Sequence, residues 1–198
     1  MNTYRINEIF YSLQGEGVRA GTPALFVRFA GCNQVCTVDT VGFDCDTDHV
    51  AGRDMALVEI VSDLRKAGPS CEWVILTGGE PALQVDKELI YGLHAAGYRL
   101  AIETNGTITL PEGLDWITVS PKLPEEKIRQ RTAHEVKFVR AAGQPIPTTT
   151  IRADHYLISP AFKGSEPAPD ALVWCIRLVL DNPQWRLSVQ SHKLWGIR

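Results

Sequence analysis

The chain has 198 residues, with 20 Lys and Arg against 23 Asp and Glu and a formal net charge of −3. At ~150 residues per domain, this length predicts a single domain over residues 1–198 with enough chain to bury a core. The balanced charge and the lack of a long basic run argue against a nucleic-acid-binding surface. No apolar stretch approaches the ~18 residues that cross a bilayer, and the first residues lack a secretory signal. We therefore expect no membrane contact and a cytoplasmic location.

Short apolar or alternating runs of strand length alternate with helical patterns along the chain. The first expected strand is 24–30, and the first helical stripe is 57–64, where apolar residues follow i, i+3, i+4, i+7 spacing. Gly68 and Pro69 end that helix. A strand at 73–77 and a helix at 85–96 follow. Further strands are expected at 99–103, 116–119, 135–139, 155–158 and 185–190, with a third helix at 170–180.

This alternation of strands and helices predicts a mostly parallel sheet covered by helices. A full eight-fold barrel takes ~250 residues, which is more than this chain has. Segment 106–115 is also too short for a crossover helix. The sequence therefore predicts an α/β fold, either an open or partial barrel or a doubly wound sheet, with some of its connections trimmed.

Polar and glycine-containing segments follow the expected strands at their carboxyl ends, where parallel α/β folds carry their chemistry. Each is ordinary turn chemistry when taken alone. Their shared position at one edge of the sheet predicts a functional site there. The segments are Gly31-Cys32, Gly78-Gly79-Glu80-Pro81, Glu103-Thr104-Asn105-Gly106, Ser120-Pro121-Lys122, Ser159-Pro160 and Ser191-His192-Lys193.

Three of the five cysteines, Cys32, Cys36 and Cys45, lie within fourteen residues, whereas Cys71 and Cys175 stand apart near apolar runs and are expected in the core. The cluster is compatible with buried thiols, with a structural zinc site completed by a histidine, or with an iron–sulfur cluster that has one open iron. A zinc-dependent RNA-binding module would bring basic side chains, but this loop is acidic and has neither Lys nor Arg. The pattern therefore favours the iron–sulfur cluster over the Cys₃His zinc site that His49 would complete.

Motifs spread over nearly the whole chain carry a resemblance to a known family. They include Gln14-Gly15-Glu16-Gly17, Gly31-Cys32-Asn33, Cys45-Asp46-Thr47, Thr77-Gly78-Gly79-Glu80-Pro81, Glu103-Thr104-Asn105-Gly106 and Gln190-Ser191-His192-Lys193. Together they resemble the radical S-adenosylmethionine (SAM) enzymes, and within them the 7-carboxy-7-deazaguanine synthase family. The resemblance implies a trimmed partial (β/α) barrel of the radical SAM type.

The same resemblance implies an activity and partners. The activity is the conversion of 6-carboxy-5,6,7,8-tetrahydropterin to 7-carboxy-7-deazaguanine with loss of ammonia, on the route to queuosine and other 7-deazapurines. The expected partners are a small pterin substrate, a second copy of the chain in a homodimer, and a flavodoxin-type electron donor. Another radical SAM enzyme, such as an activating enzyme that acts on a glycyl-radical partner, is the alternative on the same fold.

The resemblance also implies roles for individual residues. Cys32, Cys36 and Cys45 would hold a 4Fe–4S cluster, and Thr47 would bind Mg²⁺. Binding of SAM is implied for Thr77, Gly78, Gly79, Glu80, Glu103, Asn105, Ser120 and Lys122. Binding of the substrate is implied for Leu13, Gln14, Glu16, Arg28, Thr77, His192 and the terminal carboxylate of Arg198.

Three features depart from the family pattern. The gap between the last two cysteines of the cluster is eight residues, where radical SAM enzymes usually have two. The aromatic residue usual before the last cysteine is replaced by Asp44, with Phe43 one place earlier. A Gln-Pro pair in the sixth strand is replaced by Ser159-Pro160. These departures leave the shape of the cysteine loop and the contacts to the adenine of SAM unassigned.

Overall fold

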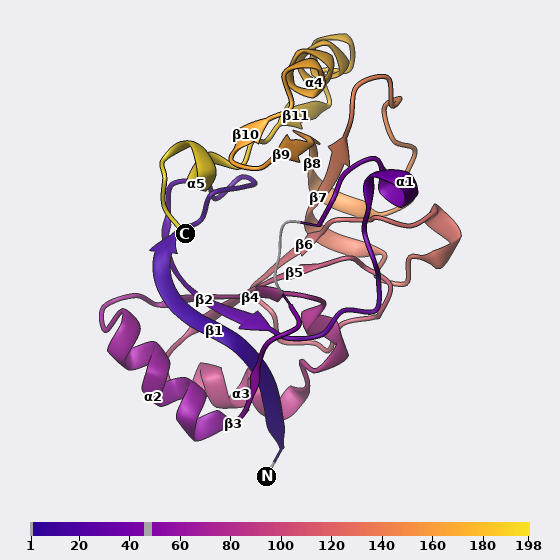
Figure 1. The fold of residues 1–198 in the computed structure, drawn as a ribbon. Helices are drawn as coiled ribbons and strands as arrows, with labels where there is room; N and C mark the ends of the chain where they lie inside the picture. The colour runs from indigo at the N-terminus through magenta and orange to yellow at the C-terminus, as the bar shows by residue number, and fades with distance from the viewer. Residues whose placement is uncertain (1, 46–48) are drawn as a thin grey trace.

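The computed structural model describes residues 2–45 and 49–198, and within them one large sheet dominates the fold (Figure 1). Its strands are β1 (Thr3–Leu13), β2 (Pro23–Phe29), β3 (Arg53–Ala56), β4 (Trp73–Gly78), β5 (Arg99–Thr104), β6 (Trp116–Val119), β7 (Thr132–Arg140), β8 (Arg152–Pro160) and β11 (Trp185–Leu187). The short strands β9 (Phe162–Lys163) and β10 (Glu166–Pro167) form a separate hairpin. The helices are α1 (Val38–Val41), α2 (Leu57–Ala67), α3 (Lys87–Ala95), α4 (Pro169–Asp181) and α5 (Ser191–Leu194).

The strand order in the large sheet is β11-β8-β7-β6-β5-β4-β2-β1-β3. Strand pairs from β2 to β11 are parallel, whereas β1 is antiparallel to both β2 and β3. Among the described residues, β3 and β11 are the two edges, and they do not pair to close a barrel. The sheet is nevertheless strongly curved (Figure 1), so the predicted mostly parallel, trimmed barrel is confirmed.

Helices α2 and α3 lie side by side on the outer face of the sheet (Figure 1) and bury its apolar side chains. In α2, Ile60 and Leu64 are fully buried, and in α3 the carboxylate of Asp86 caps the helix by accepting from the backbone N–H of Leu89 at 2.8 Å. Residues packed between these helices and the sheet form the main core, which includes Leu25, Val27, Phe29, Val74, Leu76, Leu100 and Ile102. A second core, which contains Cys175, lies farther along the sheet.

The predicted elements are present, with shifted ends. The helix expected at 170–180 is α4, and the strand expected at 185–190 stops at Leu187. Segment 106–115 contains no helix, as its length predicts. Strand β1 was not predicted, because polar and apolar side chains mix along it and a bulge lies between Ile6 and Glu8.

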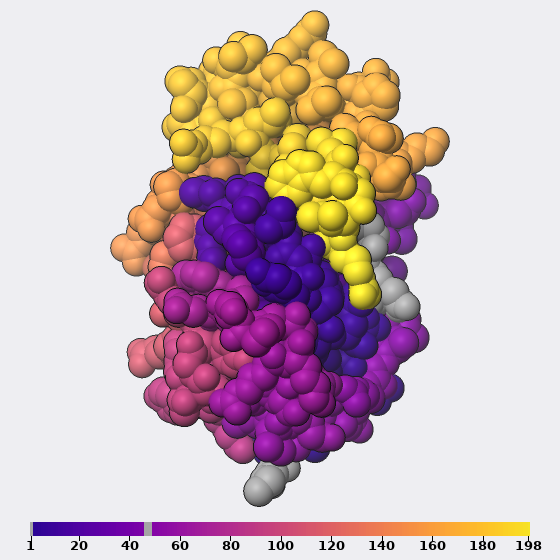
Figure 2. Space-filling model, turned by 90° about the vertical axis from the view of Figure 1, so that its left-hand side faces the viewer, coloured from indigo at the N-terminus to yellow at the C-terminus, as the bar shows by residue number. Residues whose placement is uncertain are grey.

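The carboxyl-terminal segment folds back onto β1. Figure 2 shows it, in yellow, lying against the indigo amino-terminal part of the chain. The Ser12 hydroxyl donates to the terminal carboxylate of Arg198 at 2.7 Å, and the Arg198 side chain pairs with Glu8. No helix within the described residues has the length and apolar character that crossing a membrane requires.

Candidate active site

The inner face of the sheet carries a row of polar side chains, roughly one from each strand. Arg28 of β2 is in register with Thr77 of β4, and Glu103 of β5 is in register with Thr118 of β6, which pairs in turn with Glu135 of β7. Successive side chains on a strand point to opposite faces, so the apolar neighbours of these residues point outward to the helices. The row therefore marks the polar floor of the concave side of the sheet.

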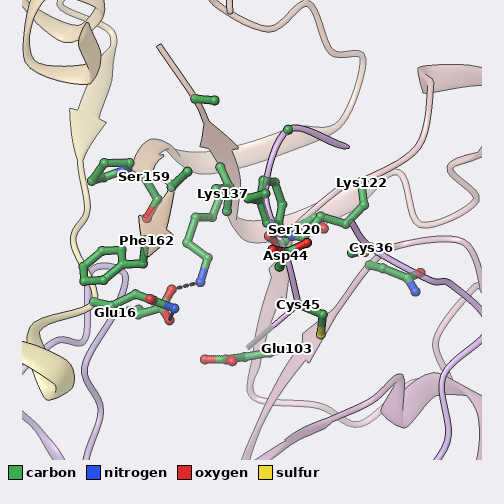
Figure 3. Close-up of a pocket in the computed structure, with 18 of the residues that line it drawn as sticks. Glu16, Cys36, Asp44, Cys45, Glu103, Ser120, Lys122, Lys137, Ser159 and Phe162 are labelled. Atoms are coloured by element: carbon green, nitrogen blue, oxygen red, sulfur yellow. Dashed lines mark hydrogen bonds and ion pairs between the residues drawn. The ribbon is translucent and has the colours of Figure 1, made fainter. Parts of the chain in front are cut away.

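A cavity of about 910 Å³ opens above this floor at the carboxyl ends of the parallel strands. Figure 3 shows part of its wall, with Glu16, Ser159 and Phe162 on one side of a common space and Cys45, Glu103 and Ser120 on the other. The predicted site residues that line it are Glu16, Cys32, Cys36, Cys45, Thr77, Gly78, Gly79, Glu80, Glu103, Asn105, Ser120 and Lys122. The structure thus brings motifs that are far apart in the sequence to one cavity.

The cysteine loop forms one wall of this cavity. Cys32 and Cys36 are half-buried there, and the backbone N–H of Cys45 donates to the carbonyl of Cys36 at 3.1 Å. Burial raises the pKa of the Cys32 and Cys36 thiols, and the nearby Cys45 adds to both shifts. The side chain of Asn105 donates to that of Asn33 at 2.9 Å, which ties the loop to the end of β5.

The turn after β4 packs tightly against the end of β2. A Cβ atom on Gly79 would lie 2.0 Å from the carbonyl oxygen of Gly31, and one on Gly78 would lie 2.5 Å from backbone atoms of Phe29. The family resemblance implies SAM contacts at both glycines, which is one reason for the lack of a side chain there. The structure shows a second reason, which is that the neighbouring strand leaves no room for a side chain.

Glu80 follows this turn and is 1% exposed. Its carboxylate accepts from the Thr104 hydroxyl at 2.6 Å and from the backbone N–H groups of Asn105 at 2.7 Å and Ala82 at 3.0 Å. Burial raises the pKa of Glu80, while the three donors act in the opposite direction. Glu80 therefore joins the ends of β4 and β5, whatever it binds in addition.

Glu103 is held on both sides by other predicted site residues. The Gln14 side chain donates to one carboxylate oxygen at 2.8 Å, and the Thr77 hydroxyl donates to the other at 3.1 Å. Above Glu103, the Lys122 ammonium contacts the Ser120 hydroxyl at 2.5 Å. These contacts fix a carboxylate and an ammonium group at the cavity wall.

Glu16 reaches the cavity from the loop between β1 and β2 and forms an ion pair with Lys137 of β7 (Figure 3). Its other carboxylate oxygen accepts from Gln190 at 3.0 Å. Burial alone would raise the pKa of Glu16, but Lys137, with Gln190 and His192 nearby, lowers it below the usual range. Burial alone would likewise lower the pKa of Lys137, but Glu16, assisted by the more distant Glu103 and Glu135, raises it. Both groups are therefore charged at neutral pH.

Other predicted substrate residues lie outside the wall of this cavity. Arg28 pairs with Glu8 at 3.0 Å, and Glu8 also binds the side chain of Arg198. Leu13 ends β1. His192 packs against the backbone of Gly15, where an added Cβ would lie 2.1 Å from the imidazole Nδ1. Thr47, the predicted Mg²⁺ ligand, lies outside the described residues.

Several residues of the cavity wall were not predicted from the sequence. Lys137 was counted as part of a strand, although its alternation with Val136 and Phe138 places it on the opposite face from them. Phe162 of the β9–β10 hairpin and Phe43 also line the cavity. The side-chain amide nitrogen of Gln34, another lining residue, is buried and has no hydrogen-bond partner among the described residues. A buried donor of this kind, facing a cavity, suits a polar ligand.

The donor set fits the cluster that the family resemblance implies. Three thiols from one loop reach one cavity, and thiolate is the usual ligand of iron–sulfur clusters. Within the described part of the chain, no three His, Cys, Asp or Glu side chains converge closely enough to bind a single metal ion. A 4Fe–4S cluster binds its thiolates through different iron atoms, so it does not require that convergence.

Comparisons with known proteins agree with this arrangement. No family model matches the chain. A 7-carboxy-7-deazaguanine synthase from Bacteroides thetaiotaomicron is 46% identical over 195 residues, which cover 98% of each chain. Its counterpart from Bradyrhizobium diazoefficiens is 42% identical over 99% of this chain and 100% of that protein.

A solved structure supports the same relationship. The crystal structure of QueE from Escherichia coli superposes with a TM-score of 0.70 at 25% sequence identity, covering 96% of this chain and 95% of that one. Near-complete coverage in both directions means that the likeness extends over almost the whole of both chains. The chain therefore belongs to the 7-carboxy-7-deazaguanine synthase family.

Proposed function

We propose that this chain is a radical SAM carbon–nitrogen lyase that converts 6-carboxy-5,6,7,8-tetrahydropterin to 7-carboxy-7-deazaguanine and ammonia. The observation that carries the proposal is the single cavity in which the cysteine loop faces half-buried carboxylates from β5 and from the β1–β2 loop. Near-full-length identity of 46% to a synthase of that name supports it. The reaction removes one ammonia from the substrate and needs no other change in composition.

Cys32, Cys36 and Cys45 would hold the 4Fe–4S cluster, and the turn of Gly78 and Gly79 with Glu80 would lie at the SAM amino-acid group. Glu103, Asn105, Ser120, Lys122 and Thr77 would contact SAM from the neighbouring strand ends. When bound, the cluster and SAM would supply the radical chemistry that the rearrangement requires. The chain itself orients the reactants and shields them from water.

The substrate would lie beside the β1–β2 loop. Glu16 and Gln14 are suited to the N–H and amino groups of a pterin, and Glu16 is held ionised by its partner. Arg28, His192, Leu13, Thr77 and the terminal carboxylate of Arg198 complete the proposed set. Arg28 is paired with Glu8, so binding a substrate carboxylate would require Arg28 to share or exchange that partner.

The test is an anaerobic assay with reconstituted protein, reductant, SAM and the tetrahydro-carboxypterin, followed by mass spectrometry. We expect 7-carboxy-7-deazaguanine from the wild-type protein and none from Cys36→Ala. No product, or equal behaviour of the two proteins, would contradict the proposal. Stoichiometric zinc without iron or labile sulfide would instead favour the zinc module.

Mg²⁺ is also part of the proposal, through Thr47 beside Cys45. A strong chelator should slow turnover, and added Mg²⁺ should restore it. Equal rates with and without the chelator would remove Mg²⁺ from the mechanism. A homodimer, a flavodoxin-type electron donor and a cytoplasmic location are proposed from the family resemblance, and light scattering tests the first of them.

A further inference from the structure

Lys137 is a buried cation, and the proposed function gives it no role beyond its ion pair with Glu16. It is 7% exposed and lines the cavity, whereas its neighbours Val136 and Phe138 point into the core on the other face of β7. Lysine is rarely buried unless it is paired. Its position on the inner face therefore calls for an explanation beyond packing.

The ammonium group of Lys137 has three N–H donors. Glu16 accepts one of them, and within the described residues the Lys137 Nζ makes no second hydrogen bond or ion pair. The nearby carboxylates are engaged elsewhere, because Glu103 binds Gln14 and Thr77, and Glu135 binds the backbone N–H of Val18 and the Thr118 hydroxyl. Leaving donors of a buried charge unsatisfied is costly, so a ligand acceptor in the cavity would stabilise the site.

The pair presents two kinds of hydrogen-bonding group side by side. Glu16 is ionised and acts as acceptor only, whereas Lys137 is protonated and acts as donor only. Because the two groups are in contact, the ligand atoms that they bind must also be neighbours. The matching ligand edge has N–H donors directly beside a carbonyl oxygen.

A pterin has that edge, since its N3–H and 2-amino groups adjoin the C4 carbonyl. The carboxylate on C6 lies at the other end of the bicyclic ring, away from the groups that Glu16 would bind. We propose that Lys137 is a specificity-determining residue that donates to the C4 carbonyl oxygen while Glu16 accepts from the adjacent N–H groups. This inference rests on the proposed function and adds to it a residue that recognises the 4-oxo group by a hydrogen bond.

The test compares two ligands on the reconstituted holoenzyme with SAM, by anaerobic titration calorimetry. One is 6-carboxypterin, and the other is its 4-thio analogue, which keeps both N–H donors but has a weakly accepting sulfur in place of the oxygen. Wild type should prefer the oxo ligand. Lys137→Met should bind it about 10- to 100-fold more weakly, and should lose most of the preference over the thio ligand. An unchanged preference in Lys137→Met would overturn the inference, as would an equal loss of affinity for both ligands.

Lys127→Met, at an exposed position outside the cavity, is the matched control and should behave as wild type. Removal of Lys137 leaves Glu16 as a buried unpaired charge, so Lys137→Met could fail to fold. In that case the comparison is between Glu16→Gln and the neutral double variant Glu16→Gln/Lys137→Met. The first should keep the oxo preference and the second should lose it, and equal preferences would overturn the inference.

The outcomes also separate this inference from the proposed function. If wild type neither binds 6-carboxypterin nor turns over 6-carboxy-5,6,7,8-tetrahydropterin, the proposed function is wrong. The proposed hydrogen bond from Lys137 to the C4 carbonyl is then wrong as well. If wild type turns over the substrate and the Lys137 variants still prefer 6-carboxypterin over its 4-thio analogue, the proposed function is supported. The proposed role of Lys137 is then wrong.

Discussion

The turn after β4 brings residue 79 against the strand that ends beside the cysteine loop. The backbone N–H of Gly79 donates to the carbonyl of Phe29 at 3.0 Å, and that of Glu80 donates to the carbonyl of Gly31 at 2.9 Å. Gly31 directly precedes Cys32, so the position of this proposed cluster ligand depends on how closely the two turns approach. A methyl group added at residue 79 should therefore displace Gly31 and, with it, the adjacent Cys32.

We predict that Gly79→Ala lowers the free energy of unfolding by about 1–3 kcal/mol and reduces the iron bound after reconstitution. The added Cβ would lie 2.0 Å from the Gly31 oxygen, and backbone cannot move aside as a flexible side chain would. Urea unfolding and iron analysis provide the two measurements.

The control for this prediction is Gly21→Ala. Gly21 has φ +85° with no heavy atom within 4 Å of an added Cβ, so that variant should lose about 1 kcal/mol from backbone strain. It should bind iron as wild type does. Full iron content in Gly79→Ala would contradict the proposed link between this turn and the cluster.

Strand β7 holds the β1–β2 loop by two of its side chains. Glu135 accepts from the backbone N–H of Val18 at 2.9 Å, and Lys137 pairs with the Glu16 side chain. Such a buried pair adds little net stability compared with an apolar pair, yet loss of one partner costs several kcal/mol because it leaves an uncompensated charge. The strand thus fixes both the backbone and the functional group of the loop.

The Glu16–Lys137 pair makes stability depend on pH in a defined direction. The lowered pKa of Glu16 contributes stability above the unfolded value of about 4.3, and this is lost as pH falls through the lower folded value. The raised pKa of Lys137 contributes stability below about 10.4, and this is lost as pH rises through the higher folded value.

We predict that the difference in free energy of unfolding between wild type and Glu16→Gln/Lys137→Met is constant from about pH 5 to 9. Below about pH 4, the difference should shift against wild type. Urea unfolding at a series of pH values measures it, and comparison with the neutral double variant cancels the titration of the shared carboxyl groups that lie away from the pair. A shift in favour of wild type at low pH would contradict the pairing.

At the scale of the whole molecule, the sequence predicts the parts that local patterns encode. The stripe of α2 and the parallel strands follow from periodicity, and the cavity motifs follow from their place at strand ends. The role of Lys137 could not be predicted, because its strand faces a cavity only after the sheet curves and the β1–β2 loop folds across it. The pairing of Arg28 and Arg198 through Glu8 joins residues 170 positions apart along the chain by tertiary contact alone.

The fold places Cys175 and the two half-buried cavity cysteines in different environments, whereas Cys71 is half-buried beside the main core. Cys175 is fully buried in the second core, where burial raises its pKa to about 11. Cys32 and Cys36 are half-buried at the cavity wall. In the metal-free protein at pH 8, an alkylating reagent should therefore modify Cys32 and Cys36 well before Cys175, since reaction requires an accessible thiolate.

Reconstitution of the cluster should protect Cys32 and Cys36 while leaving the slow labelling of Cys175 unchanged, because metal binding occupies the cavity thiols without altering the second core. Peptide mass spectrometry after timed labelling measures each site separately. Cys175→Ala is the matched variant, and it should bind as much iron as wild type although its core loses a packed side chain. Protection of Cys175 by the cluster, or loss of iron from Cys175→Ala, would mean that the two groups of thiols are not independent.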